Sequence, residues 1–379
     1  MDFSLADWPK AIRDGRCCDR QGTCSSAGVV QRHGTDEFAG LRYRREAPWV
    51  ANVISSAPGG ERFVIAVIGA GQLGSRHLQS LAMLDRNVQV WAIDPDPHSR
   101  QTAQHRWDEA SGAAERRSAL RAASSLAALP KIIDLAIVST TADVRPEVVS
   151  KLASSRVVRF WVLEKPLAQS PAGLHWLEVS TADSEGAWVN TPFRTFALFR
   201  HLRDRLLGNG QLTVHVEGPS WGLLSNAIHY LDVVQFLTGE TLTSVSTQHV
   251  SRDWYEQKRR GFWDADGLLA ARYSGGTTVD LSSGGEAVLP AFYLRQGDAE
   301  WTLDEAVGSA RSESECILTS PPPLQSEATD FLVERMWTDG TCGLPAIQAS
   351  AQLHKVFLQA VTALWRQMPD RDVREPPIT

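Results

Sequence analysis

The sequence predicts an α/β domain with a doubly wound parallel sheet, followed by an α+β domain with a large, mostly antiparallel, open sheet. Three observations indicate this fold class. Between about residues 61 and 185, short apolar runs alternate with helix-like stretches, as in βαβ units. Between about residues 242 and 305, strand-like runs are broken by Gly, Asp and Pro, as in antiparallel sheets. A length of 379 residues also suits two domains better than one.

The first domain is expected to begin with a strand at Phe63 to Ile68. This run is apolar throughout, which is typical of a strand buried on both faces. The remaining expected elements alternate between helix and strand: helix 73–84, strand 88–93, a helix from 97, strand 134–139, helix 144–152 and strand 157–163. Strands that alternate with helices at this spacing pair in parallel through right-handed crossovers.

The second domain is expected to span residues 186–379. A glycine at 239 is expected to end its main amphipathic helix, because glycine readily adopts the left-handed conformation found after helices. The expected elements are strand 188–190, helices 195–207 and 225–237, strands 268–273 and 277–281, and a closing helix 346–365.

Residues 1–60 show no sustained helical or strand period, which predicts a flexible or loosely docked extension. Three of the five cysteines lie in it, at Cys17, Cys18 and Cys24. Structural zinc normally uses four ligands in two separated pairs. We therefore expect reduced thiols and no metal site.

The overall composition excludes some classes of binding partner for this protein. Lys and Arg number 38 and Asp and Glu number 44, so the net charge is −6. That balance predicts no nucleic-acid or anionic-membrane partner. The sequence has no apolar run of about 18 residues or more and no secretory signal at its start. We expect a cytoplasmic protein.

A glycine-rich loop follows the first strand. Gly69-Ala70-Gly71-Gln72-Leu73-Gly74 matches the pattern G-x-G-x-x-G. In that context the first glycine permits a tight turn, the second lets the backbone approach a pyrophosphate, and the third packs the helix on the strand. The helix start at Gln72 and Leu73 offers unpaired N–H groups to phosphates. The loop predicts a Rossmann domain that binds a dinucleotide; the alternatives are a turn without ligand or a site for another nucleotide.

Asp94 ends the second strand, 94 − 74 = 20 residues after the last glycine. A carboxylate at this place accepts hydrogen bonds from the adenosine ribose and repels a 2′-phosphate. This favours NAD over NADP. Arg76 and Arg100 lie near enough in sequence to keep NADP as the alternative.

Glu164-Lys165-Pro166 follows the apolar strand that ends at Leu163. Ligands of open parallel sheets lie beyond the carboxyl ends of the strands, so Lys165 is expected at the cofactor cleft. A lysine there would bind a hydroxyl or take part in proton transfer. An ordinary surface lysine is the alternative.

A second group of polar residues lies on the expected helix 225–237. Ser225 and His229 are spaced i and i+4 and so share a face, with Asp232 one turn further. Asp232 is positioned by this spacing to orient or charge-stabilise His229. A histidine at the polar edge of a packed helix is the alternative.

Together these residues resemble the Gfo/Idh/MocA family, which includes glucose–fructose oxidoreductase and inositol dehydrogenases. The resemblance extends from about Phe63 to the C-terminal helix. It rests on the glycine loop, the segment from Asp134 to Arg145, Glu164-Lys165-Pro166, Asn190 to Arg194, His229-x-x-Asp232 and Leu344-Pro345.

The resemblance implies hydride transfer between NAD(P) and a hydroxyl-bearing carbon of a sugar, nucleotide sugar or cyclitol. It implies that Lys165 contacts the substrate hydroxyl and the cofactor ribose, that His229 is the acid/base or orienting residue, and that Thr140 and Glu164 belong to the cofactor site. It also implies a homodimer or homotetramer that associates through the C-terminal sheet.

Further substrate contacts are expected at Arg194, Trp221 and Asn226, because a sugar needs directional polar groups and an apolar face. Simple packing is the alternative for each. The stretch around Trp221 is similar to a subgroup of bacterial surface-sugar pathways, including those for sialic-acid-like sugars.

The sequence departs from the family pattern in one respect. Many members carry Asp four residues before the histidine, where this chain has Ser225. Two other functions therefore stay open: an epimerase, eliminase or glycosidase that uses NAD without net redox change, and a non-catalytic NAD(H)-binding sensor or scaffold.

Overall fold

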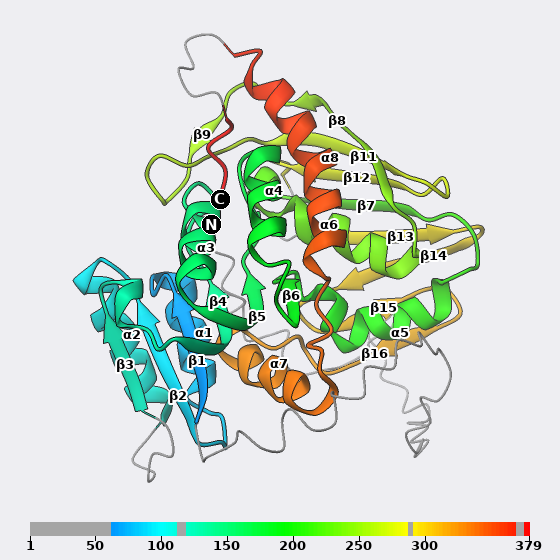
Figure 1. Ribbon diagram of the computed structural model, residues 1–379. Helices are drawn as coiled ribbons and strands as arrows, with labels where there is room; N and C mark the ends of the chain where they lie inside the picture. Colours follow the sequence, from blue (N-terminus) through cyan, green and yellow to red (C-terminus); the bar gives the residue numbers. More distant parts are fainter. Residues whose placement is uncertain (1–61, 112–118, 287–290, 369–374) are drawn as a thin grey trace. The chain divides into compact units, whose positions relative to one another are not determined.

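A computed structural model describes residues 62–111, 119–286, 291–368 and 375–379 (Figure 1). The described residues belong to one compact unit of the chain. The predicted extension at 1–60, with Cys17, Cys18 and Cys24, lies outside the described residues.

The first domain contains a six-stranded sheet with the strand order β3-β2-β1-β4-β5-β6, in which every pairing is parallel. Its elements are β1 (Phe63–Ile68), α1 (Gln72–Leu81), β2 (Val88–Ile93), α2 (Pro97–Ser111), β3 (Ala119–Ala123), β4 (Ile132–Val138), α3 (Arg145–Ser155), β5 (Val157–Leu163), α4 (Pro171–Ser180) and β6 (Gly186–Val189). The strand order reverses between β1 and β4, which is where doubly wound sheets bind ligands. The prediction of a Rossmann domain is confirmed.

Three features of this domain differ from the expected elements. The sheet continues through Val189, four residues past the expected boundary at 185. β3 was not expected, because its short sequence is half exposed and has no apolar run. α4 was not expected either, although Ser170 caps it by accepting a hydrogen bond from Gly173 N.

The second domain contains an eight-stranded sheet with the order β16-β15-β14-β13-β7-β12-β11-β8. Its strands are β7 (Thr213–Gly218), β8 (Leu242–Val250), β11 (Gly267–Tyr273), β12 (Thr278–Ser283), β13 (Ala291–Gln296), β14 (Ala299–Asp304), β15 (Ser309–Arg311) and β16 (Cys316–Leu318). All neighbours are antiparallel except β7 and β12, so the prediction of a mostly antiparallel sheet is confirmed.

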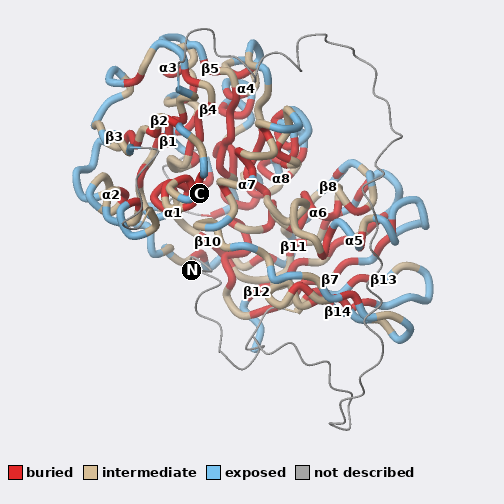
Figure 2. Tube along the Cα trace, turned by 90° about the horizontal axis from the view of Figure 1, so that it is seen from below, coloured by how far each residue is buried: buried red, intermediate tan, exposed pale blue. Residues whose placement is uncertain are grey.

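Helices cover one face of this sheet (Figure 1). They are α5 (Ala197–Leu206), which follows a 3₁₀ turn (Pro192–Thr195), α6 (Leu223–Thr238) and α8 (Ile347–Trp365). Along β7 and β12 buried residues alternate with less buried ones, as the pleat requires when one face is packed. Figure 2 shows this alternation along the strands. The other face of the sheet is left without a covering layer in the described chain.

One of the two apolar cores in the described residues joins the two domains, with members in the first sheet, the second sheet, α6 and α8. The helix α7 (Gln325–Asp339) returns to the first domain and packs on α1. Ser80 donates to Asp330 at 2.7 Å, and Arg86 pairs with Glu334 at 2.8 Å. A small hairpin, β9 (Tyr255–Glu256) with β10 (Trp263–Asp264), completes the fold. Within the described ranges, no helix combines the length and apolarity needed to cross a membrane.

Candidate functional site

The structure shows a steric need for glycine at two of the three positions of the glycine loop. Gly69 has φ +88°, and a Cβ there would lie 2.9 Å from Thr140 N. A Cβ on Gly74 would lie 1.8 Å from Gly69 O, so this glycine is needed for α1 to pack against the strand. Gly71 is different, because a Cβ there would meet nothing within 4 Å and its φ of −63° suits any residue. Nothing within the described protein requires a glycine at 71, which fits a turn kept open for a phosphate group.

The start of α1 has no side chain capping it, so the N–H groups at Gln72 and Leu73 remain directed out of the helix. Arg106 lies beside this turn and donates to Gln72 O at 2.9 Å and to Gln72 Oε1 at 2.8 Å. Burial lowers the pKa of Arg106, and the charge of Arg76 lowers it further. A guanidinium next to uncapped N–H groups forms a site suited to an anion.

Asp94 lies beside the same loop. Its carboxylate accepts from Ala70 N at 2.8 Å and from Asp96 N at 2.9 Å. The two arginines that left NADP as the alternative bind other groups than the carboxylate of Asp94. Arg100 donates to the backbone oxygen of Asp94 at 2.7 Å, and Arg76 donates to Gln79 Oε1 at 2.8 Å. The carboxylate at this turn is therefore not neutralised by an ion pair with either arginine, which is consistent with a preference for NAD.

Replacing Asp94 with Asn tests this preference. The amide oxygen still accepts from Ala70 N, but the charge that repels a 2′-phosphate is gone. We expect the ratio of NADPH to NADH dissociation constants to fall about tenfold, measured by fluorescence titration. Asp96→Asn is the matched control, because Asp96 bonds Ser99 instead of the glycine loop. An unchanged ratio in Asp94→Asn would contradict the assignment.

Glu164 is buried beneath the cleft. His77 lies 2.9 Å from Glu164 Oε1, and Asn190 Nδ2 donates to the same oxygen. Burial raises the pKa of Glu164, but the hydrogen bond and charge of His77, with Asn190 and Arg145, leave the pKa below its ordinary value. Two buried polar atoms at this edge, Thr140 Oγ1 and Asn190 Oδ1, have no hydrogen-bond partner within the described residues. Unsatisfied buried groups of this kind are expected where a ligand completes the site.

Arg145 forms hydrogen bonds to the loop after β4 and to the loop after β5. No role for it was predicted from the sequence. It is 1% exposed, and its guanidinium donates to Leu167 O at 3.1 Å, to Pro166 O and to Thr140 O. Burial lowers the pKa of Arg145 to about 10, so it stays charged at neutral pH. The loops after β4 and β5 are thereby held at one position.

Lys165 projects from the loop after β5 to the first turn of α6. Its Nζ donates to Asn226 Oδ1 at 2.8 Å and to Ser225 O at 3.0 Å. Asn226 is itself held by a bond from Nδ2 to Trp221 O at 2.8 Å. The structure thus brings together two predicted site residues, Lys165 and Asn226, that lie 61 positions apart in the sequence.

His229 lies one turn further along α6. Its ring stacks on Phe193 with centroids 5.2 Å apart, and its buried Nδ1 has no partner within the described residues. Burial lowers the pKa of His229 well below 6.5, and the charges of Lys165 and His354 lower it further. The imidazole is therefore neutral at pH 7.

The expected partnership of Asp232 with His229 is not observed. Asp232 instead accepts from Thr191 Oγ1 at 2.9 Å and from Arg194 Nε at 2.8 Å. Burial raises the pKa of Asp232, and the charge of Arg194 opposes that shift. A buried carboxylate needs such a partner, so α6 directs Asp232 towards Arg194 and away from the histidine.

This arrangement also changes how Arg194 and Trp221 are interpreted. The guanidinium of Arg194 is occupied by Asp232 and lies over the ring of Phe236. Trp221 is 3% exposed, and its indole N–H donates to Ser282 O at 2.8 Å. Both side chains have structural partners, which corresponds to the packing alternative for each.

Asp264 was missed by sequence reasoning. Its buried carboxylate accepts from Leu224 N at 2.8 Å, from Ser225 N at 3.2 Å and from Ser225 Oγ at 2.7 Å. Burial raises the pKa of Asp264, and these hydrogen bonds oppose the shift. A carboxylate therefore does lie beside Ser225, but it comes from β10 and caps α6. No local pattern in the sequence indicates it.

His354 on α8 is a further buried histidine near the cleft. It is 0% exposed, its Nδ1 lies 2.7 Å from Ser350 O, and its Nε2 has no partner in the described chain. Burial lowers the pKa of His354 to about 4. The bond to Ser350 opposes this shift, whereas the charges of Arg145 and Lys165 add to it.

A dependence of stability on pH follows for His354. Its folded pKa lies below the unfolded value, so the unfolded chain takes up a proton first as pH falls. We expect the free energy of unfolding to decrease between about pH 6.5 and pH 4, by up to about 1.4 kcal/mol per pH unit for this residue. Urea denaturation across this window should show a shallower slope for His354→Asn. The exposed His201→Asn serves as control, and equal slopes for both variants would contradict the prediction.

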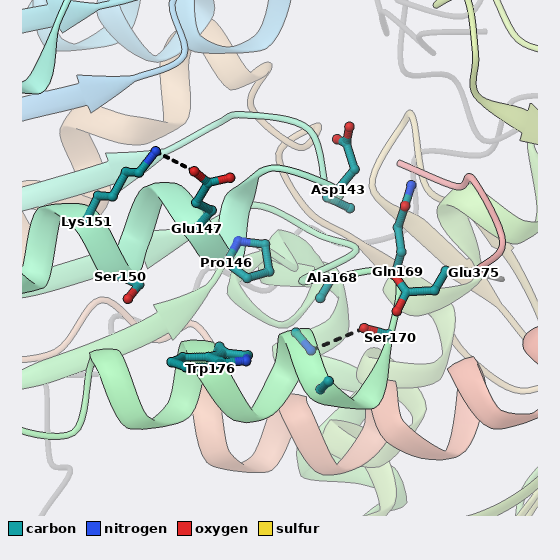
Figure 3. Close-up of a pocket in the computed structure, with 13 residues that line it drawn as sticks. Asp143, Pro146, Glu147, Ser150, Lys151, Ala168, Gln169, Ser170, Trp176 and Glu375 are labelled. Carbon is teal, nitrogen blue, oxygen red and sulfur yellow. Dashed lines mark hydrogen bonds and ion pairs between the residues drawn. The ribbon is translucent and has the colours of Figure 1, made fainter. Parts of the chain in front are cut away.

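A separate hollow of about 440 Å³ lies between the N-terminal halves of α3 and α4. Figure 3 shows Asp143, Gln169 and Glu375 at one end and Trp176 on α4 below, with the ion pair of Lys151 and Glu147 on α3. None of the predicted site residues lines this hollow. It is therefore distinct from the place where Lys165 meets α6.

Residues 63–189 match the model of GFO_IDH_MocA, described as an oxidoreductase family with an NAD-binding Rossmann fold. This domain belongs to the Gfo/Idh/MocA oxidoreductase family. The predicted resemblance is confirmed, and the open glycine turn agrees with the NAD-binding fold of the family. Among curated proteins, none matches the chain.

Solved structures of similar fold extend the likeness from the matched domain to the second domain. UDP-N-acetylglucosamine 3-dehydrogenase from Acidithiobacillus ferrooxidans has a TM-score of 0.58 at 16% identity, over 80% of this chain and 97% of that one. Myo-inositol dehydrogenase from Lactobacillus casei, with NAD(H) and myo-inositol, has a TM-score of 0.59 at 15% identity, over 81% and 95%. The WlbA dehydrogenase from Bordetella pertussis, with NADH and UDP-GlcNAcA, has a TM-score of 0.57 at 16% identity, over 85% and 99%. At these identities the likeness shows the fold.

Proposed function

We propose that this chain is an NAD-dependent dehydrogenase or reductase that acts on a CH–OH group of a sugar, nucleotide sugar or cyclitol. The observation that carries the proposal is the contact of Lys165 Nζ with Asn226 and Ser225 on α6. This contact places a cation from the cofactor domain on the helix that carries His229. Two side chains from different domains that meet beside the nicotinamide end of the cleft suit proton transfer at a carbinol.

NAD bound at the glycine turn would supply or accept the hydride at that carbon. The hydroxyl proton must leave from, or return to, the oxygen on the same carbon. Lys165 holds a positive charge where that oxygen would carry negative charge, and α6 has already oriented its Nζ. His229 is neutral, so one of its ring nitrogens is able to accept a proton. We assign Lys165 to stabilising the oxygen and His229 to holding the proton.

The similar solved structures support the substrate class. They include a UDP-N-acetylglucosamine 3-dehydrogenase and a myo-inositol dehydrogenase in complex with myo-inositol. The chain spans nearly the whole length of both proteins. A substrate with a ring of hydroxyl groups is consistent with a site that offers Lys165, Asn226 and His229 on one side.

The uncovered face of the eight-stranded sheet supports a homodimer or homotetramer. Its outward side chains include Tyr293 and His215, whose rings stack 6.2 Å apart, and Tyr293 is 38% exposed. A second copy that covered this face would bury such aromatic groups.

Fluorescence titration with NADH and with NADPH, followed by absorbance assays with NAD and a panel of sugars and cyclitols, tests the proposal. We expect NADH to bind more tightly than NADPH and at least one substrate to reduce NAD with net formation of NADH. Turnover without net NADH would favour transient use of NAD, and binding without any turnover would favour a sensor. Failure to bind either cofactor would refute the proposed function.

A further inference from the structure

The hairpin of β9 and β10 carries three consecutive cations at its tip: Lys258, Arg259 and Arg260. All three are exposed, and no ion pair to any of them is formed by the residues that the structure describes. The acidic residue beside them is Glu256, whose carboxylate accepts from Gly261 N at 2.8 Å and so belongs to the turn. The tip thus has an excess of positive charge, on a chain whose net charge is −6.

A short series of hydrogen bonds connects the hairpin to the first turn of α6, which Lys165 contacts. Gln257 Nε2, one residue before Lys258, donates to Ser225 Oγ and, at 2.9 Å, to Asp264 Oδ2. The carbonyl of the same Ser225 accepts from Lys165 Nζ at 3.0 Å. Gln257 and Lys165 therefore contact the same residue of α6, Ser225, and the first cation of the tip, Lys258, follows Gln257 directly in the sequence.

The electrostatic effect of Arg259 on Arg145 also indicates that the tip lies close to the loop after β5. Arg145 holds the loop after β5, which carries Lys165, by donating to Pro166 O and Leu167 O. The pKa of Arg145 is lowered chiefly by burial and also by the positive charge of Arg259. The charge of Arg259 therefore reaches Arg145, the residue that holds the loop after β5.

The base of the hairpin is anchored at three places. Trp263 N donates to Pro377 O at 2.8 Å, and Figure 1 shows β9 close to the C-terminus. Trp254, just before β9, packs on Trp365 of α8 with ring centroids 4.9 Å apart. Asp264, the last residue of β10, is buried at the start of α6. A tip with a fixed base loses little freedom when it binds a ligand.

We propose that Lys258, Arg259 and Arg260 bind an anionic group of the substrate, a phosphate or a carboxylate, while its reacting hydroxyl lies at Lys165. This inference rests on the proposed function and narrows its substrate class to acidic or phosphorylated sugars, including nucleotide sugars. Arginine pairs with phosphate and carboxylate through two parallel hydrogen bonds. A bound anion also offsets the repulsion among the tip cations, Lys165 and Arg145.

Calorimetry on the full chain with saturating NADH tests this inference. The probes are uridine diphosphate, glucose 6-phosphate, glucuronate and neutral glucose, which distinguish diphosphate, phosphate monoester and carboxylate as the source of the charge. We expect at least one anionic probe to bind at least about tenfold more tightly than glucose. We expect Arg259→Ala/Arg260→Ala to lose about tenfold of that affinity, with NADH and glucose binding unchanged.

Arg200→Ala/Arg311→Ala is the matched control, because both arginines are exposed and lie on α5 and β15, away from the hairpin. This control should retain wild-type affinity for every probe. Equal binding of glucose and all three anions, or full anion affinity in the hairpin variant, would overturn the inference. If the wild-type chain did not bind NADH at all, the proposed function itself would be overturned. Failure of this inference and failure of the proposed function are therefore distinguishable.

Discussion

Lys165→Ala is expected to lower kcat by a factor of about 10² to 10⁴, the usual contribution of a positioned proton-transfer or charge-stabilising group. The variant removes the ammonium group that bonds Asn226 Oδ1 and Ser225 O. NADH binding should change far less, because the glycine turn and Asp94 are untouched. Steady-state kinetics with the substrate identified by the NAD assay, together with an NADH titration, measure both effects.

Two variants make this result specific to Lys165. Lys151→Ala is the matched control, because Lys151 is an exposed residue of α3 that pairs only with Glu147 among the described contacts. Asn226→Ala leaves Lys165 in place but removes one of its orienting partners. We expect it to reduce kcat about tenfold, with the pH profile of kcat displaced. Full activity of Lys165→Ala, with the folded state retained, would refute the proposed role.

Gly74→Ala is expected to lose stability, whereas Gly71→Ala is expected to lose affinity for NADH. A Cβ on Gly74 would lie 1.8 Å from Gly69 O, so α1 must move off the strand. We expect Gly74→Ala to cost about 3 kcal/mol of unfolding free energy, although Ala is ordinarily the better helix former. A Cβ on Gly71 meets no protein atom within 4 Å, so Gly71→Ala should change stability by less than about 1 kcal/mol.

The binding measurement separates the two glycines. In Gly71→Ala the added methyl group enters the open space above the turn, where the pyrophosphate is expected to approach. We expect NADH to bind at least about tenfold more weakly, while the urea midpoint stays near that of the wild type. Unaltered NADH affinity in this variant would show that the cofactor does not lie against the turn.

The elements that sequence reasoning located best are those with a strong local signal. β2 and β5 have the predicted bounds, Val88–Ile93 and Val157–Leu163, because each is a mostly apolar segment with a single polar residue, Gln89 or Arg159. The missed helix α7 has no such signal. It packs on α1 partly through polar contacts, Ser80 with Asp330 and Arg86 with Glu334, so its sequence lacks a continuous apolar stripe.

The candidate site likewise has a part that the sequence predicted and a part that it did not. The glycine turn was predictable because its glycines lie within six residues of one another and Gly74 packs directly against the backbone of Gly69. The expected pairing of Asp232 with His229 was wrong, since helical spacing says which residues share a face but not what lies opposite that face. Arg194, from the preceding 3₁₀ turn, lies there and engages the carboxylate.

By itself, the sequence determined the Rossmann domain, its cofactor turn and the position of Lys165 at a strand end, because these depend on residues near one another in the chain. Only the tertiary structure decided what Lys165 contacts, that Asp264 from β10 caps α6 beside Ser225, and that the cations of the β9–β10 hairpin lie near both. Those contacts join segments 32 to 61 residues apart. Their partners are selected by the packing of two domains on a common core, which no local pattern encodes.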